Sequence, residues 1–70
     1  MKMYDCDSSQ IARYGYEPET RTLAIEFTRG GVYEYYDVPQ EIFEAFLAAE
    51  SKGSWHYHNI KGKYRYEKVG

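Results

Sequence analysis

Apolar and polar side chains alternate most regularly between Thr22 and Thr28, where Leu23, Ile25 and Phe27 occupy every second position. Successive side chains of an extended strand point to opposite faces of a sheet. The alternation therefore predicts a strand with one buried face, and its β-branched and aromatic residues favour the same structure. The neighbouring elements can be placed relative to this strand.

A preceding strand is expected over residues 10–16, and a turn at residues 17–20 joins it to the strand that begins at Thr22. Pro18 fixes its own φ there, and the flanking acidic residues keep the turn in water. We therefore expect an antiparallel hairpin. It pairs Tyr14 with Ile25 and Tyr16 with Leu23, and simple alternation places Ala12, Tyr14 and Tyr16 on one face and Ile11, Arg13 and Gly15 on the other.

A third strand follows a pair of glycines and carries three tyrosines within residues 30–36. If the loop before it is the three residues 29–31, Phe27 pairs with Tyr33. A two-residue loop would turn Glu34 into the core, at a cost of about 3 kcal/mol or more for an unpaired buried charge. We therefore expect the longer loop. It puts Gly31 in the left-handed conformation, pairs Ile25 with Tyr35, and gives a buried face of Leu23, Ile25, Phe27, Tyr33 and Tyr35.

Two helices and a final extended segment are expected in the second half of the chain. Pro39 suits a first helical turn, where its missing N–H is no loss. Gly53 is expected to end this helix, Ser54 to cap a shorter one that runs to Ile60, and Gly62 to end that one. The apolar stripe of the first helix is Ile42, Phe43, Phe46, Leu47 and Ala49, and residues 64–69 alternate enough for a last strand or an extended tail.

The expected fold is thus α+β: a three-stranded antiparallel meander with a helix packed on it, a short second helix and a C-terminal strand or tail. A chain of 70 residues makes one domain, expected over residues 9–70, with residues 1–8 as a disordered or loosely attached tail. The single cysteine, Cys6, permits no internal disulfide, which fits a reducing, cytoplasmic setting. No apolar run approaches the roughly 20 residues of a membrane span, and no secretory signal is visible.

A series of single residues and short motifs spans nearly the whole chain. In order, it is Ser9 with Ile11, Gly15-Tyr16, Leu23, Phe27, Gly31, Tyr33-x-Tyr35, Val38-Pro39, Ser51-Lys52-Gly53, Asn59-Ile60 and Tyr64. In this order and spacing they resemble the KTSC domain. That family is named after the C-terminal extension of some lysyl-tRNA synthetases and also occurs as small stand-alone bacterial proteins. The sequence departs from the family at His56, where an aromatic residue such as Phe is usual, and at Tyr57, where a polar residue is usual. The resemblance implies an RNA-binding role and no established activity.

The residues offer little for catalysis or for metal binding. His56 and His58 are two positions apart, so on a helix their side chains diverge by about 200°, and no further histidine is present. Ser51 and Ser54 lie near His56, but serines beside a glycine at a helix junction are usually caps. We therefore expect no catalytic site, no metal and no cofactor, with His56 half-buried and His58 exposed.

The charge distribution carries the strongest functional hint. Residues 1–50 hold ten acidic and four basic side chains, whereas residues 51–70 hold one acidic and five basic ones. Cations beside aromatic rings suit single-stranded nucleic acid, because phosphates bind the cations and bases stack on the rings. The simpler alternative is that the basic end pairs with the acidic body. The candidate RNA-binding residues are Lys52, Trp55, Lys61, Lys63, Tyr64, Arg65 and Tyr66.

The Tyr33-x-Tyr35 pair also has two interpretations. The rings are either buried against the first helix or turned outward as a stacking platform, and the predicted register favours burial, which leaves Tyr36 as the better exposed candidate. Two functions of different class remain open. One is a non-enzymatic domain that binds tRNA or single-stranded RNA, and the other is a module for protein interaction or self-association.

Overall fold

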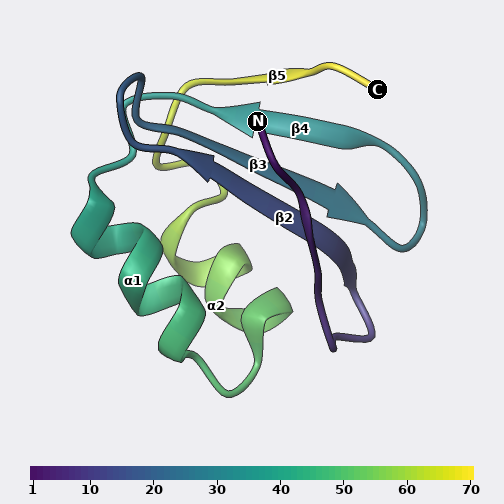
Figure 1. The fold of residues 1–70 in the computed structure, drawn as a ribbon. Coiled ribbons are helices and arrows are strands. Elements are labelled where there is room, and N and C mark those ends of the chain that lie inside the picture. The colour runs from purple at the N-terminus through teal and green to yellow at the C-terminus, as the bar shows by residue number, and fades with distance from the viewer.

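The computed structural model describes residues 1–70 as a five-stranded antiparallel sheet with two helices on one of its faces (Figure 1). The strands lie in sequence order across the sheet, so every connection joins neighbours. The α+β class and the antiparallel meander are confirmed, and each edge of the meander carries a further strand. The elements are β1 (Tyr4–Asp5), β2 (Ile11–Glu17), β3 (Thr22–Phe27), β4 (Val32–Tyr35), α1 (Gln40–Ala48), α2 (Lys52–Asn59) and β5 (Tyr66–Lys68).

The hairpin of β2 and β3 has the expected register, with Tyr14 opposite Ile25 and Tyr16 opposite Leu23. The placement of Ile11 on the outer face is wrong. The register shifts between Ile11 and Arg13, which is a β-bulge, and Ile11 then lies opposite Phe27. The extra residue reverses the alternation, so Ile11 is fully buried in the core.

The hairpin of β3 and β4 has a three-residue loop, but it is residues 28–30 rather than 29–31. The Phe27 N–H donates to the Gly31 carbonyl at 3.1 Å, and the Gly30 N–H donates to the Phe27 carbonyl at 2.9 Å. Ile25 therefore pairs with Tyr33, two residues away from the predicted partner. A shift of two preserves the face of every side chain, so the predicted buried face survives. Gly31 has the expected positive φ of 93°, and Gly30 has one of 108°.

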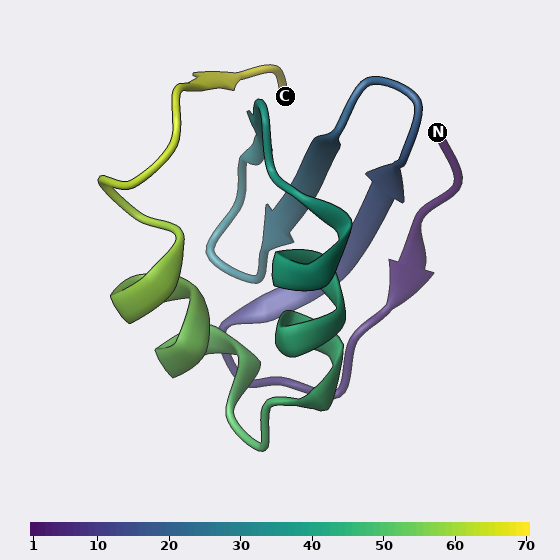
Figure 2. The ribbon, with the colours of Figure 1, turned by 90° about the vertical axis from the view of Figure 1, so that its left-hand side faces the viewer.

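The N-terminal residues lie against the sheet, where a loose tail was expected. Tyr4 of β1 pairs with Tyr14, and the Cys6 N–H donates to the Ala12 carbonyl at 2.9 Å. Gly15 leaves room for this segment, because a Cβ there would stand 2.6 Å from the Lys2 carbonyl oxygen. Figure 2 shows β1 and β5 at opposite edges of the sheet.

The boundary between the helices differs from the prediction. Helix α1 ends at Ala48, and Ser51 is the N-cap of α2, with its Oγ accepting from the Ser54 N–H at 3.3 Å. Gly53 is therefore buried in the first turn of α2 instead of ending α1. Ser51 and Ser54 are equally good cap residues, so propensity alone could not choose between them.

The core lies between the sheet and α1. Leu47, expected in the apolar stripe of α1, is 39% exposed, because the helix presents Phe46 to the sheet instead. The Tyr16 hydroxyl donates to the Val38 carbonyl at 2.6 Å and ties β2 to the start of α1. The buried apolar side chains of this core are Ile11, Leu23, Ile25, Tyr35, Val38, Phe46 and Ile60.

Candidate functional site

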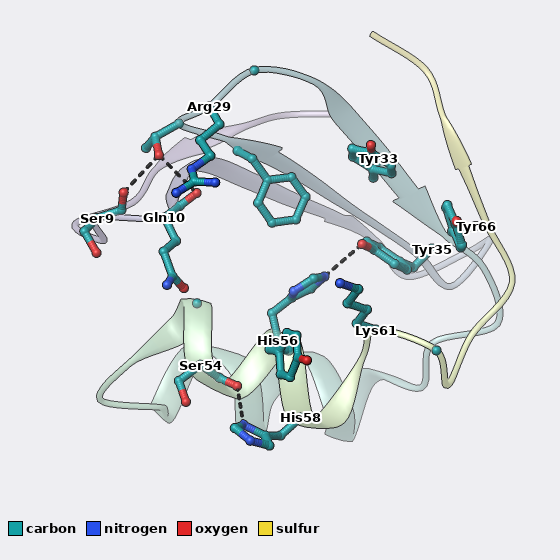
Figure 3. Close-up of a pocket in the computed structure, with 16 residues that line it drawn as sticks. Ser9, Gln10, Arg29, Tyr33, Tyr35, Ser54, His56, His58, Lys61 and Tyr66 are labelled. Atoms are coloured by element: carbon teal, nitrogen blue, oxygen red, sulfur yellow. Dashed lines mark hydrogen bonds between the residues drawn. The ribbon is translucent and has the colours of Figure 1, made fainter.

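A single groove of about 1080 Å³ opens between α2 and the sheet, where β3, β4 and β5 extend beyond the cover of α1 (Figure 3). Its upper wall is the sheet and the β3–β4 loop, and its lower wall is α2 and the turn that follows. The volume lies at the upper end of the range of ligand sites. β5 contributes Tyr66 to the groove, because its pairing with β4 places that residue beside Tyr35.

The floor of the groove is a buried pair from β4 and α2. The Tyr35 hydroxyl and Nε2 of His56 share a hydrogen bond at 2.8 Å, and His56 is only 6% exposed. The His56 ring also meets Phe27 edge-on, with ring centroids 5.1 Å apart. His56 therefore occupies an aromatic environment, which suits a position where the family usually has an aromatic residue.

Both members of the pair are uncharged near neutral pH. Burial lowers the pKa of His56 to about 4, and the nearby Lys61 ammonium contributes to the lowering. Burial also raises the pKa of Tyr35 to about 12, and the neighbouring Tyr33 and Tyr66 contribute to this increase. A deep charge would have to be paired, so this neutral floor suits an uncharged, planar group better than an anion.

Aromatic side chains form the sheet side of the groove. Tyr66 of β5 is 54% exposed, and its ring lies 5.9 Å from Tyr33 and 5.8 Å from Tyr35 between centroids. Tyr33 is half-buried and also meets Phe27 edge-on at 5.6 Å. The groove thus offers adjoining ring surfaces of which Tyr66 is the most accessible.

The charges along the groove are all positive. Arg29 comes from the β3–β4 loop and Lys61 from the turn after α2, and no aspartate or glutamate is among the sixteen lining residues. Figure 3 shows both side chains directed toward the interior of the groove. Lys61 also lies over the Tyr57 ring, with Nζ 5.0 Å from its centroid. An all-positive groove is unexpected on a chain of net charge −2.

The structure divides the residues that the sequence nominated for RNA contact. Lys61 and Tyr66 line the groove. Lys52 is partly buried and its Nζ donates to the Ala49 carbonyl at 3.3 Å. Trp55 packs against the core, with its ring 6.0 Å from Phe46.

The other three nominated residues also lie outside the groove. Tyr64 is partly buried against the core, and Lys63 is exposed in the turn before β5. Arg65 lies over Tyr36, 5.1 Å from its ring centroid, on the face of the sheet that points away from the helices. Tyr36 itself is partly buried there, and its hydroxyl donates to Glu34 at 3.2 Å.

Sequence reasoning missed the groove residues that come from the first half of the chain. Arg29 stood out only as part of a loop, and Gln10 only as the start of a strand. Phe27 and Tyr33 were assigned to the core because alternation places them on the helix-facing side. Alternation identifies the face of a strand but not where the covering helix stops, so no signal in the sequence could separate buried from groove-lining positions.

The second histidine, His58, is exposed, as expected. His58 lies at the rim of the groove, where its Nδ1 is 2.9 Å from the Ser54 carbonyl oxygen, as Figure 3 shows. No group of three or more His, Cys, Asp or Glu side chains is placed to hold a metal ion. No helix in the structure has the length and apolar character needed to cross a membrane.

Comparison with known proteins places this geometry in a family. The model of the KTSC domain family matches residues 7–64. A lysine–tRNA ligase of Nostoc sp. is 43% identical over 63 residues, which are 90% of this chain but 11% of that protein. The chain thus spans about a tenth of the length of the lysine–tRNA ligases it matches.

Proteins about as long as this chain are also similar to it in sequence. A protein of Tsukamurella paurometabola is 43% identical over 90% of this chain and 94% of its own length, and one of Stutzerimonas stutzeri is 37% identical over 99% of both. The crystal structure of a KTSC domain protein from Yersinia pestis matches with a TM-score of 0.95 at 38% identity, covering 99% of this chain and 97% of that one. The chain belongs to the KTSC domain family.

Proposed function

We propose that this domain is a non-enzymatic module that binds single-stranded RNA in the groove between α2 and the sheet. One observation carries the proposal. On an acidic chain, the groove combines accessible aromatic rings with two cations and contains no carboxylate. This is the combination that single-stranded nucleic acid requires, because its bases stack and its phosphates need positive partners.

The sheet supplies the stacking surface. Sheet-borne aromatic side chains bind unstacked RNA bases in other folds, and base–aromatic stacking contributes about 1–3 kcal/mol per base. Tyr66 and Tyr33 are the rings that a base would meet in this groove. The neutral pair of Tyr35 and His56 lies beneath them and accepts an uncharged base without a charge penalty.

Arg29 and Lys61 supply the phosphate contacts. They come from opposite walls of the groove, so a strand that enters it meets a cation on either side. The acidic residues lie elsewhere on the surface and would repel an RNA strand from those regions. This electrostatic arrangement favours the groove over the exposed Lys63 and Arg65, although the sequence nominated both of them.

The relatives support an RNA ligand independently of the geometry. Several proteins that contain this domain are lysine–tRNA ligases, whose substrate by name is a tRNA, while others consist of little besides the domain. Figure 1 shows both chain termini near the strands and remote from the two helices. Transfer RNA and short single-stranded RNA are therefore the probes to use.

The test compares two pairs of substitutions that change the charge equally. Fluorescence anisotropy would measure the binding of labelled single-stranded RNA and of tRNA at about 50 mM and about 200 mM salt. We expect Arg29→Gln with Lys61→Gln to weaken binding and to flatten the salt slope by about 1.4, or about 0.7 for each single-strand phosphate that no longer has a cationic partner. Lys63→Gln with Arg65→Gln is the matched control and should retain most of the affinity.

Two results would contradict the proposal. Equal weakening by both pairs would mean that the RNA responds to net charge rather than to the groove. If the parent protein binds no RNA at low salt, the domain is not an RNA-binding module, and the alternative of a protein-interaction or self-association module takes its place. Sedimentation of the parent protein alone would then be the next measurement.

A further inference from the structure

β5 forms one edge of the sheet, as Figure 2 shows, and its only strand neighbour is β4. All of residues 65–69 are exposed, so no other part of the chain covers this edge. An open edge presents unpaired N–H and C=O groups, and a strand from another chain can pair with them. β5 is therefore a place where the sheet can be extended.

The backbone groups that β5 offers can be assigned from its pairing with β4. The Tyr36 N–H donates to the Arg65 carbonyl at 2.9 Å, so Arg65 is a bonding position toward β4. Bonding positions recur at every second residue of an antiparallel pair, which makes residue 67 the next one. Tyr66 and Lys68 therefore direct their N–H and C=O groups away from β4, toward any strand that adds at the edge.

Two charges on β5 have no ionic partner within the chain. Arg65 and Glu67 lie on the face of the sheet away from the helices, where the ion pair that the protein does form joins Arg13 to Glu26. Arg65 lies over an aromatic ring, and Glu67 stands opposite Glu34 of β4. Like charges directly opposite each other destabilise a strand pair. A cation from a neighbouring strand would relieve this repulsion.

The charges select one register for the pairing of β5 with a second copy of itself. Outward-directed residues must face each other, so a two-fold axis can pass through residue 66, 67 or 68. An axis at Glu67 sets two glutamates opposite each other, and an axis at Lys68 sets two lysines opposite each other. An axis at Tyr66 instead sets Arg65 of each copy opposite Glu67 of the other, on both sides of the axis.

We propose that two copies of this chain pair antiparallel along β5, about a two-fold axis at Tyr66, to form one continuous sheet. The two Tyr66 rings then adjoin on the helix-facing side, and two Arg65–Glu67 ion pairs form on the opposite face. The same edge is used by both copies, so the contact closes as a dimer and does not propagate into a filament. The strand is short, so the interface is below the size of a stable one and the dimer is transient. Each groove is complete within one chain, and the inference does not depend on RNA binding.

The test reverses the charges one at a time. Sedimentation equilibrium at low salt, over a wide range of concentration, would compare the parent with Arg65→Glu, Glu67→Arg and Lys63→Glu. We expect the mass of the parent to approach twice that of the monomer as the concentration rises. Arg65→Glu and Glu67→Arg should each weaken dimerisation by about tenfold or more, because each turns two attractive cross-strand pairs into repulsive ones. Lys63→Glu makes the same charge change in the exposed turn before β5 and should dimerise like the parent.

A mixture of the two weakened variants tests the register itself. Arg65→Glu and Glu67→Arg in equal amounts should associate about as tightly as the parent, because each copy then supplies the charge that the other needs. The inference is overturned if the parent stays monomeric at every concentration, if the mixture associates no better than its components, or if Lys63→Glu weakens the dimer as much as Arg65→Glu.

The two proposals fail separately. A parent that dimerises in this way but binds no RNA refutes the proposed function and supports the dimer. A parent that binds RNA but never dimerises does the reverse.

Discussion

Both halves of the helix-facing side of the sheet carry tyrosine rings, but the rings are packed against a helix in one half and partly open in the other. Under α1, Tyr16 stacks on Phe43 with ring centroids 4.5 Å apart, and Tyr14 meets Phe46 edge-on at 5.4 Å. Beside α2, Tyr33 and Tyr66 adjoin each other at 5.9 Å, but the groove leaves one side of them open. The closed half stabilises the fold, and the open half is the candidate binding surface.

The contrast arises from where the helices lie and not from the composition of the strands. Helix α1 brings Phe46, which is fully buried, directly onto β2 and β3. Helix α2 brings His56 to the sheet, and its hydrogen bond to Tyr35 holds it there. A polar contact at the floor leaves space above it that a packed aromatic side chain would fill. An excess of tyrosine can therefore serve as core and as surface within one face of one sheet.

The largest expected effect is in the closed half. Phe46→Ala removes a fully buried ring from the centre of the core, and we expect it to lower the free energy of unfolding by about 3–5 kcal/mol. Urea or thermal denaturation would measure the loss, which is enough to unfold a domain of this size. A Phe46→Ala protein that melts like the parent would show that α1 does not close this half.

The next effect is a pH dependence that originates at the floor of the groove. The pKa of His56 is lowered from 6.5 to about 4 in the folded protein, so the unfolded chain binds more protons between these values. Stability should therefore fall as the pH falls from 6.5 toward 4, by about 3 kcal/mol from this group. His56→Phe should remove this part of the dependence, whereas His58→Gln, a change at an exposed residue of the same helix, should keep it.

A smaller effect is expected from the hydrogen bond within that pair. Tyr35→Phe keeps the ring but removes the hydroxyl, and it leaves Nε2 of the buried His56 without its partner. The expected loss is about 1–3 kcal/mol of unfolding free energy, the cost of an unsatisfied buried polar atom. The double variant Tyr35→Phe with His56→Phe should be more stable than Tyr35→Phe alone. If it is not, the pair is not what joins α2 to the sheet.

The smallest effect on stability is expected in the open half. Tyr66→Ala removes a ring that is more than half exposed and should change the free energy of unfolding by less than about 1 kcal/mol, the value of a cross-strand pair. The same change should weaken RNA binding by about 1–3 kcal/mol, because a stacking surface is removed. Phe46→Ala and Tyr66→Ala therefore separate the halves, one through stability and the other through binding.

The sequence predicted the closed half better than the open one. Alternation at Leu23, Ile25 and Phe27 identified the central strand and its buried face, and the turn at Pro18 fixed the first register. The two errors of register came from single-residue events. The bulge beside Ala12 reversed Ile11, and the loop shifted by one because Gly30 and Gly31 can both take positive φ.

The candidate site was predictable only in its chemistry. Aromatic and cationic residues are among those that line the groove, and of the nominated residues Lys61 and Tyr66 do so. Clustering along the chain suggested Trp55 and Arg65 as their neighbours, but the fold turns Trp55 into the core and Arg65 to the opposite face. The other polar residues that line the groove include Arg29 and Gln10, which are remote from them in sequence and reach the groove only through strand pairing.

The decisive test of RNA binding in the groove is a chemical-shift titration of the 15N-labelled protein with a single-stranded RNA hexamer at low salt. We predict that the shifted backbone amides belong to groove residues, above all Gly30, Tyr33, Ser54 and Tyr66. Amides of residues such as Arg13 and Glu26, whose side chains form an ion pair on the outer face, should stay in place. Shifts concentrated on the outer face, or no shifts at all, would refute the assignment of RNA binding to the groove.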